Sequence, residues 1–153
     1  MPGGSSTNLS GLPFENAVDL RPHIDTRFRY VGKGTFRATM KSMGLRDTSV
    51  EALHGCKQPD GAYLDVDSRI LVIVEVKNQM TGGSVVEKLQ TAGVKRFNYK
   101  ELYPTLRVEY IYILSDWFRT HCPAELRYLS TVGIPVYWGS NFKEAADYIS
   151  RLR

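Results

Sequence analysis

The chain has 153 residues, a length that suits one domain with room for a substantial hydrophobic core. Its 42% hydrophobic and 24% charged residues are typical of a globular protein, and no apolar run approaches the roughly 18 residues that a membrane span requires. The net charge of +4 is a modest excess, which permits a polyanionic partner without requiring one.

The N-terminal segment is rich in Gly, Ser, Pro and Asn, which predicts a flexible tail over residues 1–11 and a single domain over residues 12–153. The tail lacks the basic and apolar segments of a secretory signal, so we expect a cytoplasmic protein. A helix is predicted from Leu12 to about Arg21, with an early proline that suits the first turn. Glu15 lies near its start, where the helix dipole favours a carboxylate.

Residues 28–58 have the weakest pattern, although Thr35–Met43 predicts a short helix that ends at Gly44. Basic side chains gather in this region with aromatic residues between them, and again on a later predicted helix. Both groups are candidate contacts for phosphates, and an ordinary solvated surface explains any single member equally well. The two groups are Arg27, Arg29, Lys33, Arg37, Lys41 and Arg46, and Lys88, Lys95, Arg96 and Lys100.

The most apolar part of the chain, Ile70–Val74, is rich in β-branched residues and predicts a buried strand. The preceding residues 63–66 suggest a shorter strand, and Asp67-Ser68 suggests a tight turn between the two. Side chains alternate along a strand, so Glu75 and Lys77 emerge on the same face where the apolar run ends.

Helices and strands alternate in the second half of the chain. Ser84 to about Leu102 predicts an amphipathic helix with Ser84 as its N-cap, and Ser140 or Asn141 is a candidate cap for the last helix. The other predicted elements are a strand at 109–115, a helix at 124–132, a strand at 134–138 and the last helix, which runs to about residue 152. This alternation predicts an α/β layered domain.

The charged residues at the end of the apolar strand are the candidates for a catalytic or metal-binding site. A buried carboxylate and ammonium cost several kcal/mol to desolvate without partners. A hairpin of the predicted size would return Asp60 to the neighbourhood of Glu75. Two carboxylates on neighbouring strands suit Mg²⁺, a hard cation that takes few protein ligands and keeps water and phosphate oxygens.

The spacing of Asp60, Glu75 and Lys77 resembles that of the PD-(D/E)XK nuclease superfamily, the restriction-endonuclease-like enzymes. In that family the Asp and Glu bind Mg²⁺, the Lys orients or activates water, and the carbonyl of the intervening residue, here Val76, often joins the metal sphere. The Gln79, Gly-Ser and Glu-Lys succession that follows is similar to one found in bacterial type II restriction enzymes. The resemblance covers roughly residues 12 to 115.

The resemblance implies a central mixed sheet flanked by helices, a Mg²⁺ cofactor, double-stranded DNA as the substrate and a homodimer. An acidic residue on the first helix of these enzymes often reaches the metal site, and Glu15 fits that role by position. Gln79 would contact the site or the backbone. The residues that we expect to contact DNA are Lys33, Arg37, Lys41, Lys88 and Lys95.

Two other functions remain open at this point. A junction-resolving, repair or toxin nuclease of the same fold would use the same catalytic residues, so the motif does not separate it from a site-specific restriction enzyme. A non-catalytic nucleic-acid-binding module would keep the fold without the chemistry. The intact Asp60, Glu75 and Lys77 argue against the module, and a metal titration would separate it from the nucleases.

Overall fold

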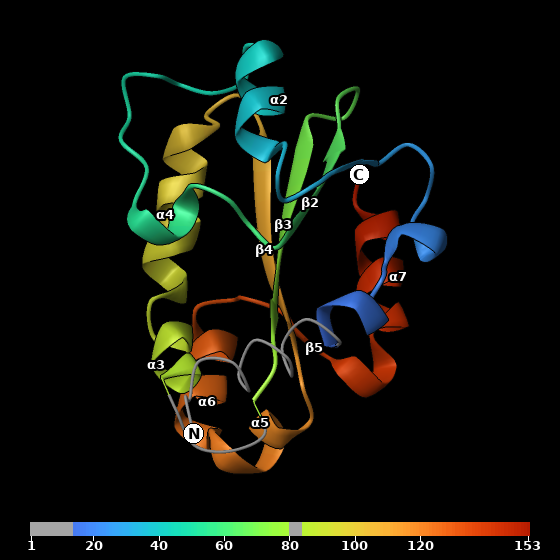
Figure 1. Cartoon of the computed structure of the whole chain (residues 1–153), viewed down its shortest axis with the longest axis vertical. Helices are drawn as coiled ribbons and strands as arrows, with labels where there is room; N and C mark the ends of the chain where they lie inside the picture. Colours follow the sequence, from blue (N-terminus) through green and yellow to red (C-terminus); the bar gives the residue numbers. More distant parts are fainter. Residues whose placement is uncertain (1–13, 80–83) are drawn as a thin grey trace, which may run out of the picture.

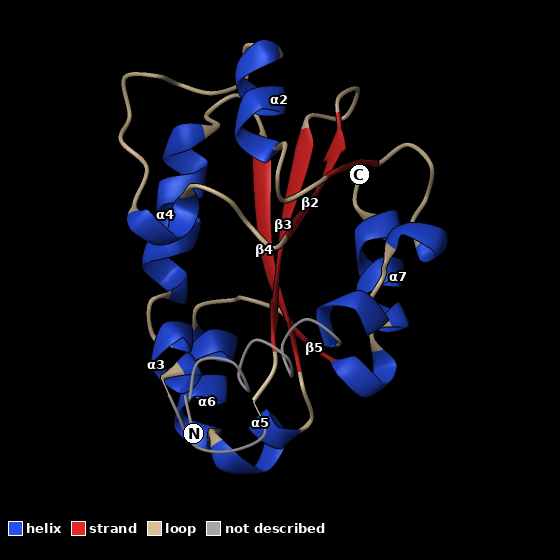
Figure 2. Cartoon of the chain, viewed as in Figure 1, coloured by secondary structure: helices blue, strands red, loops and turns tan. Residues whose placement is uncertain are grey.

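The computed structural model describes residues 14–79 and 84–153, so the predicted tail and the first residues of the first predicted helix lie outside the described residues. A five-stranded sheet runs through the centre, with helices on both faces (Figures 1 and 2). Its strands are β1 (Arg29–Val31), β2 (Gly61–Asp65), β3 (Ile70–Lys77), β4 (Arg107–Leu114) and β5 (Val136–Trp138). The helices named below are α2 (Phe36–Ser42), α3 (Val85–Leu89), α4 (Ala92–Leu102), α5 (Trp117–His121), α6 (Pro123–Thr131) and α7 (Lys143–Arg151).

The sheet is mixed, and its strands lie in the same order as in the sequence. β1, β2 and β3 form an antiparallel meander, whereas β4 is parallel to β3 and β5 is parallel to β4. The parallel pairing of β3 with β4 requires a crossover, which α3 and α4 provide. The prediction of a mixed α/β sheet flanked by helices is therefore confirmed.

Both faces of β3 are buried, which explains its unbroken apolar sequence. Leu71 and Ile73 pack into a core with α2, α4 and α6. Val72 and Val74 point to the other face, where α7 and the segment around Phe28 cover them. Figure 1 shows this division, with α2, α3 and α4 on one side of the sheet and α7 on the other.

Several predicted helix boundaries are wrong. The helix expected from Ser84 to Leu102 is two helices, α3 and α4, because Thr91 leaves helical geometry and donates its hydroxyl to the Lys88 carbonyl. Ser84 makes no side-chain cap. The first helix ends at residue 17 and a 3₁₀ turn follows at Arg21–His23.

The last helix is also capped differently from the prediction. α7 begins after a 3₁₀ turn at Gly139–Asn141, and Phe142 holds its N-cap position. Ser140 donates instead to Asp116, and the Asn141 amide donates to Glu144.

Other expectations are confirmed. α2 ends where predicted, because Gly44 adopts a left-handed φ of +69° that favours glycine. β4, α6 and β5 lie within two residues of their predicted positions. β1 and α5 are elements that the sequence did not indicate. No helix among the described residues is long and apolar enough to cross a membrane.

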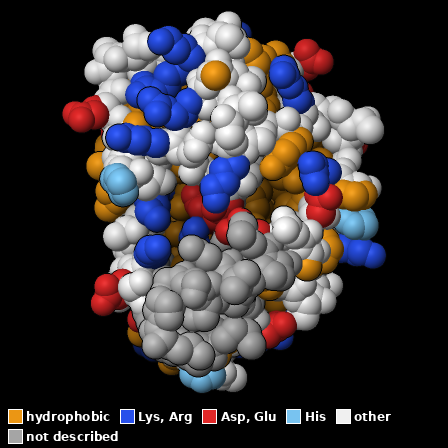
Figure 3. Space-filling view, viewed as in Figure 1, with side chains coloured by type: hydrophobic (Ala, Val, Ile, Leu, Met, Phe, Trp, Pro, Cys, Tyr) orange, Lys and Arg blue, Asp and Glu red, His pale blue; other side chains and the backbone are white. Residues whose placement is uncertain are grey.

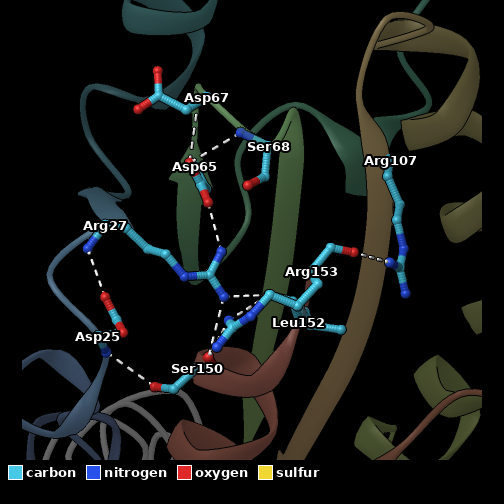
Figure 4. Close-up of polar contacts among 9 residues, drawn as sticks. All are labelled: Asp25, Arg27, Asp65, Asp67, Ser68, Arg107, Ser150, Leu152 and Arg153. Atoms are coloured by element: carbon cyan, nitrogen blue, oxygen red, sulfur yellow. Dashed lines mark hydrogen bonds and ion pairs between the residues drawn. The ribbon is translucent and has the colours of Figure 1, made fainter.

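Arg27 joins two distant parts of the chain (Figure 4). Its guanidinium donates to Asp65 Oδ2 at 2.6 Å, to the Ser150 carbonyl at 3.1 Å and to the Leu152 carbonyl. Asp65 also accepts the backbone N–H groups of the turn that follows β2. Arg27 is thus committed to the fold, which corrects its inclusion among the candidate phosphate contacts.

Candidate active site

The site forms where β2 and β3 separate. Their backbone pairing stops at Gly61 and Val74, so the next residue back, Asp60, has left the ladder. Its carboxylate takes the place of a backbone partner on β2: Asp60 Oδ2 accepts a hydrogen bond from the backbone N–H of Val76 at 2.9 Å. The same oxygen accepts a hydrogen bond from the Lys77 ammonium at 3.0 Å. The hairpin therefore brings Asp60 to the end of β3.

Lys77 contacts both carboxylates. Its ammonium lies 3.0 Å from Asp60 Oδ2 and 3.4 Å from Glu75 Oε2. Glu75 and Lys77 share one face of β3, while the Val76 side chain packs on the opposite face. The Val76 N–H is bonded to Asp60, which leaves the Val76 carbonyl as the group for the metal-ligand role that the resemblance implies. Lys33 reaches the other oxygen of Asp60 at 3.3 Å.

Burial and mutual repulsion set the charges of this cluster. Glu75 is 5% exposed, and its burial together with the neighbouring Asp60 charge raises the pKa of Glu75 to about 8. Burial opposes the charge of Asp60, but Lys77 and the hydrogen bonds to its carboxylate hold the Asp60 pKa below its ordinary value. Burial likewise opposes the charge of Lys77, but Glu75 and Asp60 raise its pKa overall.

This arrangement fits a divalent cation. Lys33 and Lys77 both contact Asp60, whereas Glu75 has only a share of Lys77, at 3.4 Å, so a further positive charge would stabilise Glu75 when it ionises. Within the described ranges no group of three His, Cys, Asp or Glu residues is placed to hold a metal ion. Mg²⁺ does not need such a group, because one or two carboxylates together with water and phosphate oxygens complete its shell.

A groove of about 670 Å³ opens on the Glu75 face of β3. Five lysines line this groove beside three carboxylates, so its charge is positive overall. Three of the lysines are predicted DNA contacts, Lys33, Lys88 and Lys95, and they share the groove with Asp60 and Glu75. In the view of Figure 3, carboxylate side chains lie near the middle of the visible surface, with several Lys and Arg side chains close by.

The other two predicted DNA contacts lie apart from the carboxylates. Arg37 and Lys41 line a second hollow of about 650 Å³ together with Arg46. This hollow shares Lys57 and Gln58 with the groove, so the two basic surfaces adjoin.

The two supporting residues have different surroundings. Glu15 lies near Asp60: partial burial, and then the charge of Asp60, raise the pKa of Glu15. The backbone of Gln79 is held by Ser115, whose hydroxyl accepts the Gln79 N–H at 3.0 Å and donates to the Gln79 carbonyl at 3.1 Å. The Gly-Ser part of the downstream motif at residues 81–84 lies largely outside the described residues.

Sequence reasoning missed several residues of the site. Lys57 lines the groove and precedes Asp60 by three positions, so proximity to the motif was a usable indication. No such indication exists in the sequence for Ser115, because only the parallel pairing of β3 and β4 brings its N–H to the Lys77 carbonyl. Tyr112 is the partner of Glu75 in that same register, on the neighbouring strand, and is fully buried.

Comparison of the chain with protein-family models, with curated proteins and with solved structures finds no match. The residues of the site therefore carry the functional assignment by themselves. Their most informative property is that a hairpin and a strand end bring two carboxylates and a lysine into direct contact beside a lysine-lined groove.

Proposed function

We propose that this protein is a Mg²⁺-dependent DNA endonuclease with a restriction-endonuclease-like fold. One observation carries the proposal: Lys77 contacts both Asp60 and Glu75 at the end of β3, on the edge of a groove in which lysines outnumber carboxylates. The mixed sheet flanked by helices is the architecture that the resemblance implies.

Asp60 and Glu75 would hold the Mg²⁺ ion, with the Val76 carbonyl as a third ligand. When bound, the ion supplies positive charge to the phosphate and lowers the pKa of a coordinated water. Lys77 donates hydrogen bonds to the attacking water or to a phosphate oxygen, which stabilises the charge that develops during phosphodiester hydrolysis. Burial of Glu75 keeps this chemistry in a region of weak solvent screening.

The substrate that we propose is double-stranded DNA. Lys33, Lys88 and Lys95 lie along the groove at positions where they would contact backbone phosphates, which supply most non-specific affinity. A type II restriction enzyme would act as a homodimer, because two antiparallel strands require two sites related by a two-fold axis. A structure-specific or toxin nuclease would use the same residues, and only the choice of DNA separates these classes.

The deciding experiment incubates the protein with plasmid, bacterial genomic DNA and branched DNA, with Mg²⁺ or with EDTA. Discrete fragments indicate a site-specific enzyme, a smear indicates a non-specific nuclease, and selective cutting of the branched substrate indicates a structure-specific one. Asp60→Ala and Glu75→Ala should abolish cleavage, whereas Asp67→Asn, an exposed acid at the other end of the hairpin, should not. Cleavage at the wild-type rate by either alanine variant would refute the proposal.

A further inference from the structure

A third hollow, the cup, lies on the opposite face of β3 from the groove. This cup has a volume of about 250 Å³, and Tyr63, Val74, Val76 and Ile113 contribute its apolar part. It shares Lys33 and Asp60 with the groove, so one carboxylate forms part of the wall of both hollows. A molecule bound at Asp60 can therefore extend to either side of the sheet.

The two hollows differ in charge. Five lysines face three carboxylates in the groove, whereas only Arg21 and Lys33 face three carboxylates in the cup. The two cup cations are already paired, Arg21 with Asp19 at 2.8 Å and Lys33 with Asp60 at 3.3 Å. An anion is therefore favoured in the groove, and an uncharged group is favoured in the cup.

An aromatic wall makes the cup suited to a flat group. Tyr30 is 39% exposed, and its ring lies 5.4 Å from the ring of Tyr63. The exposed guanidinium of Arg21 lies 5.1 Å from the centre of the Tyr30 ring, so a flat group that stacks on this ring would take the place of Arg21. Asn16 adds an exposed amide at the rim, which can both donate and accept hydrogen bonds.

The size of the cup narrows the choice of occupant. At roughly 30 Å³ per water molecule, 250 Å³ is far more than one ion or a single water needs. It is below the roughly 300–1,000 Å³ of sites for drug-sized ligands. One planar ring system with polar edges fits these limits.

We infer that the cup binds one nucleobase that is swung out of the duplex beside the phosphate to be cleaved. The inference rests on the proposed function, because it places the phosphate at Asp60 and Lys77 and the attached base across the sheet edge. Extruding a paired base requires unpairing and unstacking, and an unpaired base avoids that cost. The preferred substrate is accordingly a duplex with an unpaired nucleotide next to the scissile bond.

Two variants test the cup and keep the side chains of Asp60, Glu75 and Lys77. Tyr30→Ala removes the stacking surface. Gly61→Ala adds a methyl group that points into the cup, and the nearest described atom to that methyl is Tyr30 Cε2 at an ordinary 3.7 Å, so the variant should fold. Phe97→Ala is the matched control, because Phe97 is an exposed aromatic residue that lines neither hollow.

The first measurement compares a duplex carrying one unpaired 2-aminopurine with the fully paired duplex, in Ca²⁺ for binding and in Mg²⁺ for cleavage. The wild-type protein should bind and cut the bulged duplex preferentially, with a fluorescence change from the 2-aminopurine. Tyr30→Ala should lower the bulged-to-paired affinity ratio about tenfold, as expected for loss of one base–aromatic stack. Gly61→Ala should also lower this ratio, because its methyl group takes space from the base, and Phe97→Ala should keep the wild-type ratio. If the wild-type protein binds and cuts the two duplexes equally well, the inference is overturned while the nuclease proposal stays intact.

A second measurement needs neither cleavage nor a metal. Deoxyadenosine monophosphate is added to the ¹⁵N-labelled protein, and the backbone amides of Gly61 and Phe97 are followed by NMR. A saturable shift at Gly61 alone, weakened by Tyr30→Ala, supports the cup even if no DNA is cut, in which case the nuclease proposal falls separately. No shift at Gly61 overturns the inference.

Discussion

Lys77 differs from a surface lysine because both carboxylates of the site contact its ammonium. Replacing it by alanine should lower the cleavage rate about 10²–10³-fold, as expected for loss of one donor to a developing negative charge. DNA binding in Ca²⁺ should persist, since Ca²⁺ supplies the carboxylates with a positive partner and other lysines contact the backbone. A gel shift in Ca²⁺ and a cleavage assay in Mg²⁺ measure the two effects separately.

The control for this prediction is Lys143→Ala, an exposed lysine on α7 that lines neither the groove nor the cup, which should bind and cut as the wild type does. If binding and cleavage fall by the same factor in Lys77→Ala, then Lys77 is a DNA contact and not a catalytic residue.

Glu75 should make the stability of the metal-free protein depend on pH. Its pKa is about 8 in the fold and 4.5 without it, so between these pH values the folded state binds a proton that the unfolded state has lost. Stability therefore decreases as pH rises through this window, by up to about 1.4 kcal/mol per pH unit. Urea unfolding in EDTA between pH 5 and 8 measures the slope.

Glu75→Gln removes the titrating group while keeping its shape. This variant should have a flatter stability profile and should be more stable than the wild type at pH 8. Glu87→Gln, an exposed carboxyl on the groove rim, should retain the wild-type slope. Stability that increases from pH 5 to pH 8 in the wild type would contradict the assigned direction of the pKa shift.

At the scale of elements, Asn98 on α4 hydrogen-bonds to the segment before Lys57, which lines one side of the groove. This buried amide accepts the Leu53 N–H at 3.0 Å and donates to the Glu51 carbonyl at 3.0 Å, which fastens the segment that leads to Lys57. Asn98→Ala should cost about 1–3 kcal/mol of unfolding free energy and should also weaken DNA binding.

Urea unfolding and a gel shift check this prediction, with Glu101→Ala, an exposed residue on the same helix, as the control. Loss of stability without any change in DNA affinity would show that the Asn98 clamp supports the fold but not the groove.

The elements that the sequence predicted well carry strong local patterns. β3 and β4 are apolar runs, and Gly44 ends α2 through its own backbone preference. β1 could not be found in this way, because Arg29 and Tyr30 are both exposed and break the alternation. The division between α3 and α4 was also hidden, since Thr91 is compatible with a helix and its hydroxyl bond to Lys88 is visible only in the fold.

The same distinction applies to the site. Asp60, Glu75 and Lys77 belong to one hairpin, so sequence spacing alone was enough to bring them together. Tyr30 and Ser115 reach the site through strand pairings between distant segments, β1 with β2 and β3 with β4. Register between distant strands depends on the packing of the whole sheet, which a local pattern does not contain.

For the whole molecule, the proposed function predicts that divalent cations stabilise the fold. An ion that binds only the folded state adds about 2.7 kcal/mol at a concentration of 100 Kd. Thermal unfolding should therefore shift upwards with Mg²⁺ or Ca²⁺ in the wild type, and the shift should be lost in Asp60→Asn. An equal shift in both proteins would place the ion somewhere other than this site.

The resemblance to type II enzymes also predicts a homodimer, since cutting both strands requires two sites. Light scattering at micromolar protein concentration measures the mass in solution. A monomer that nicks only one strand of a plasmid would contradict this prediction and would favour the structure-specific class of nuclease.

The position of α7 in the chain has a consequence for synthesis on the ribosome. α7 is translated after all five strands, yet Ala145, Ala146 and Ile149 cover one face of β3 and β4. That apolar face is consequently exposed on the nascent chain until α7 has emerged. Arg27 likewise lacks its hydrogen bonds to the Ser150 and Leu152 carbonyls until then. Since exposed sheet faces favour aggregation, the chain should aggregate most readily in the interval before α7 packs against the sheet.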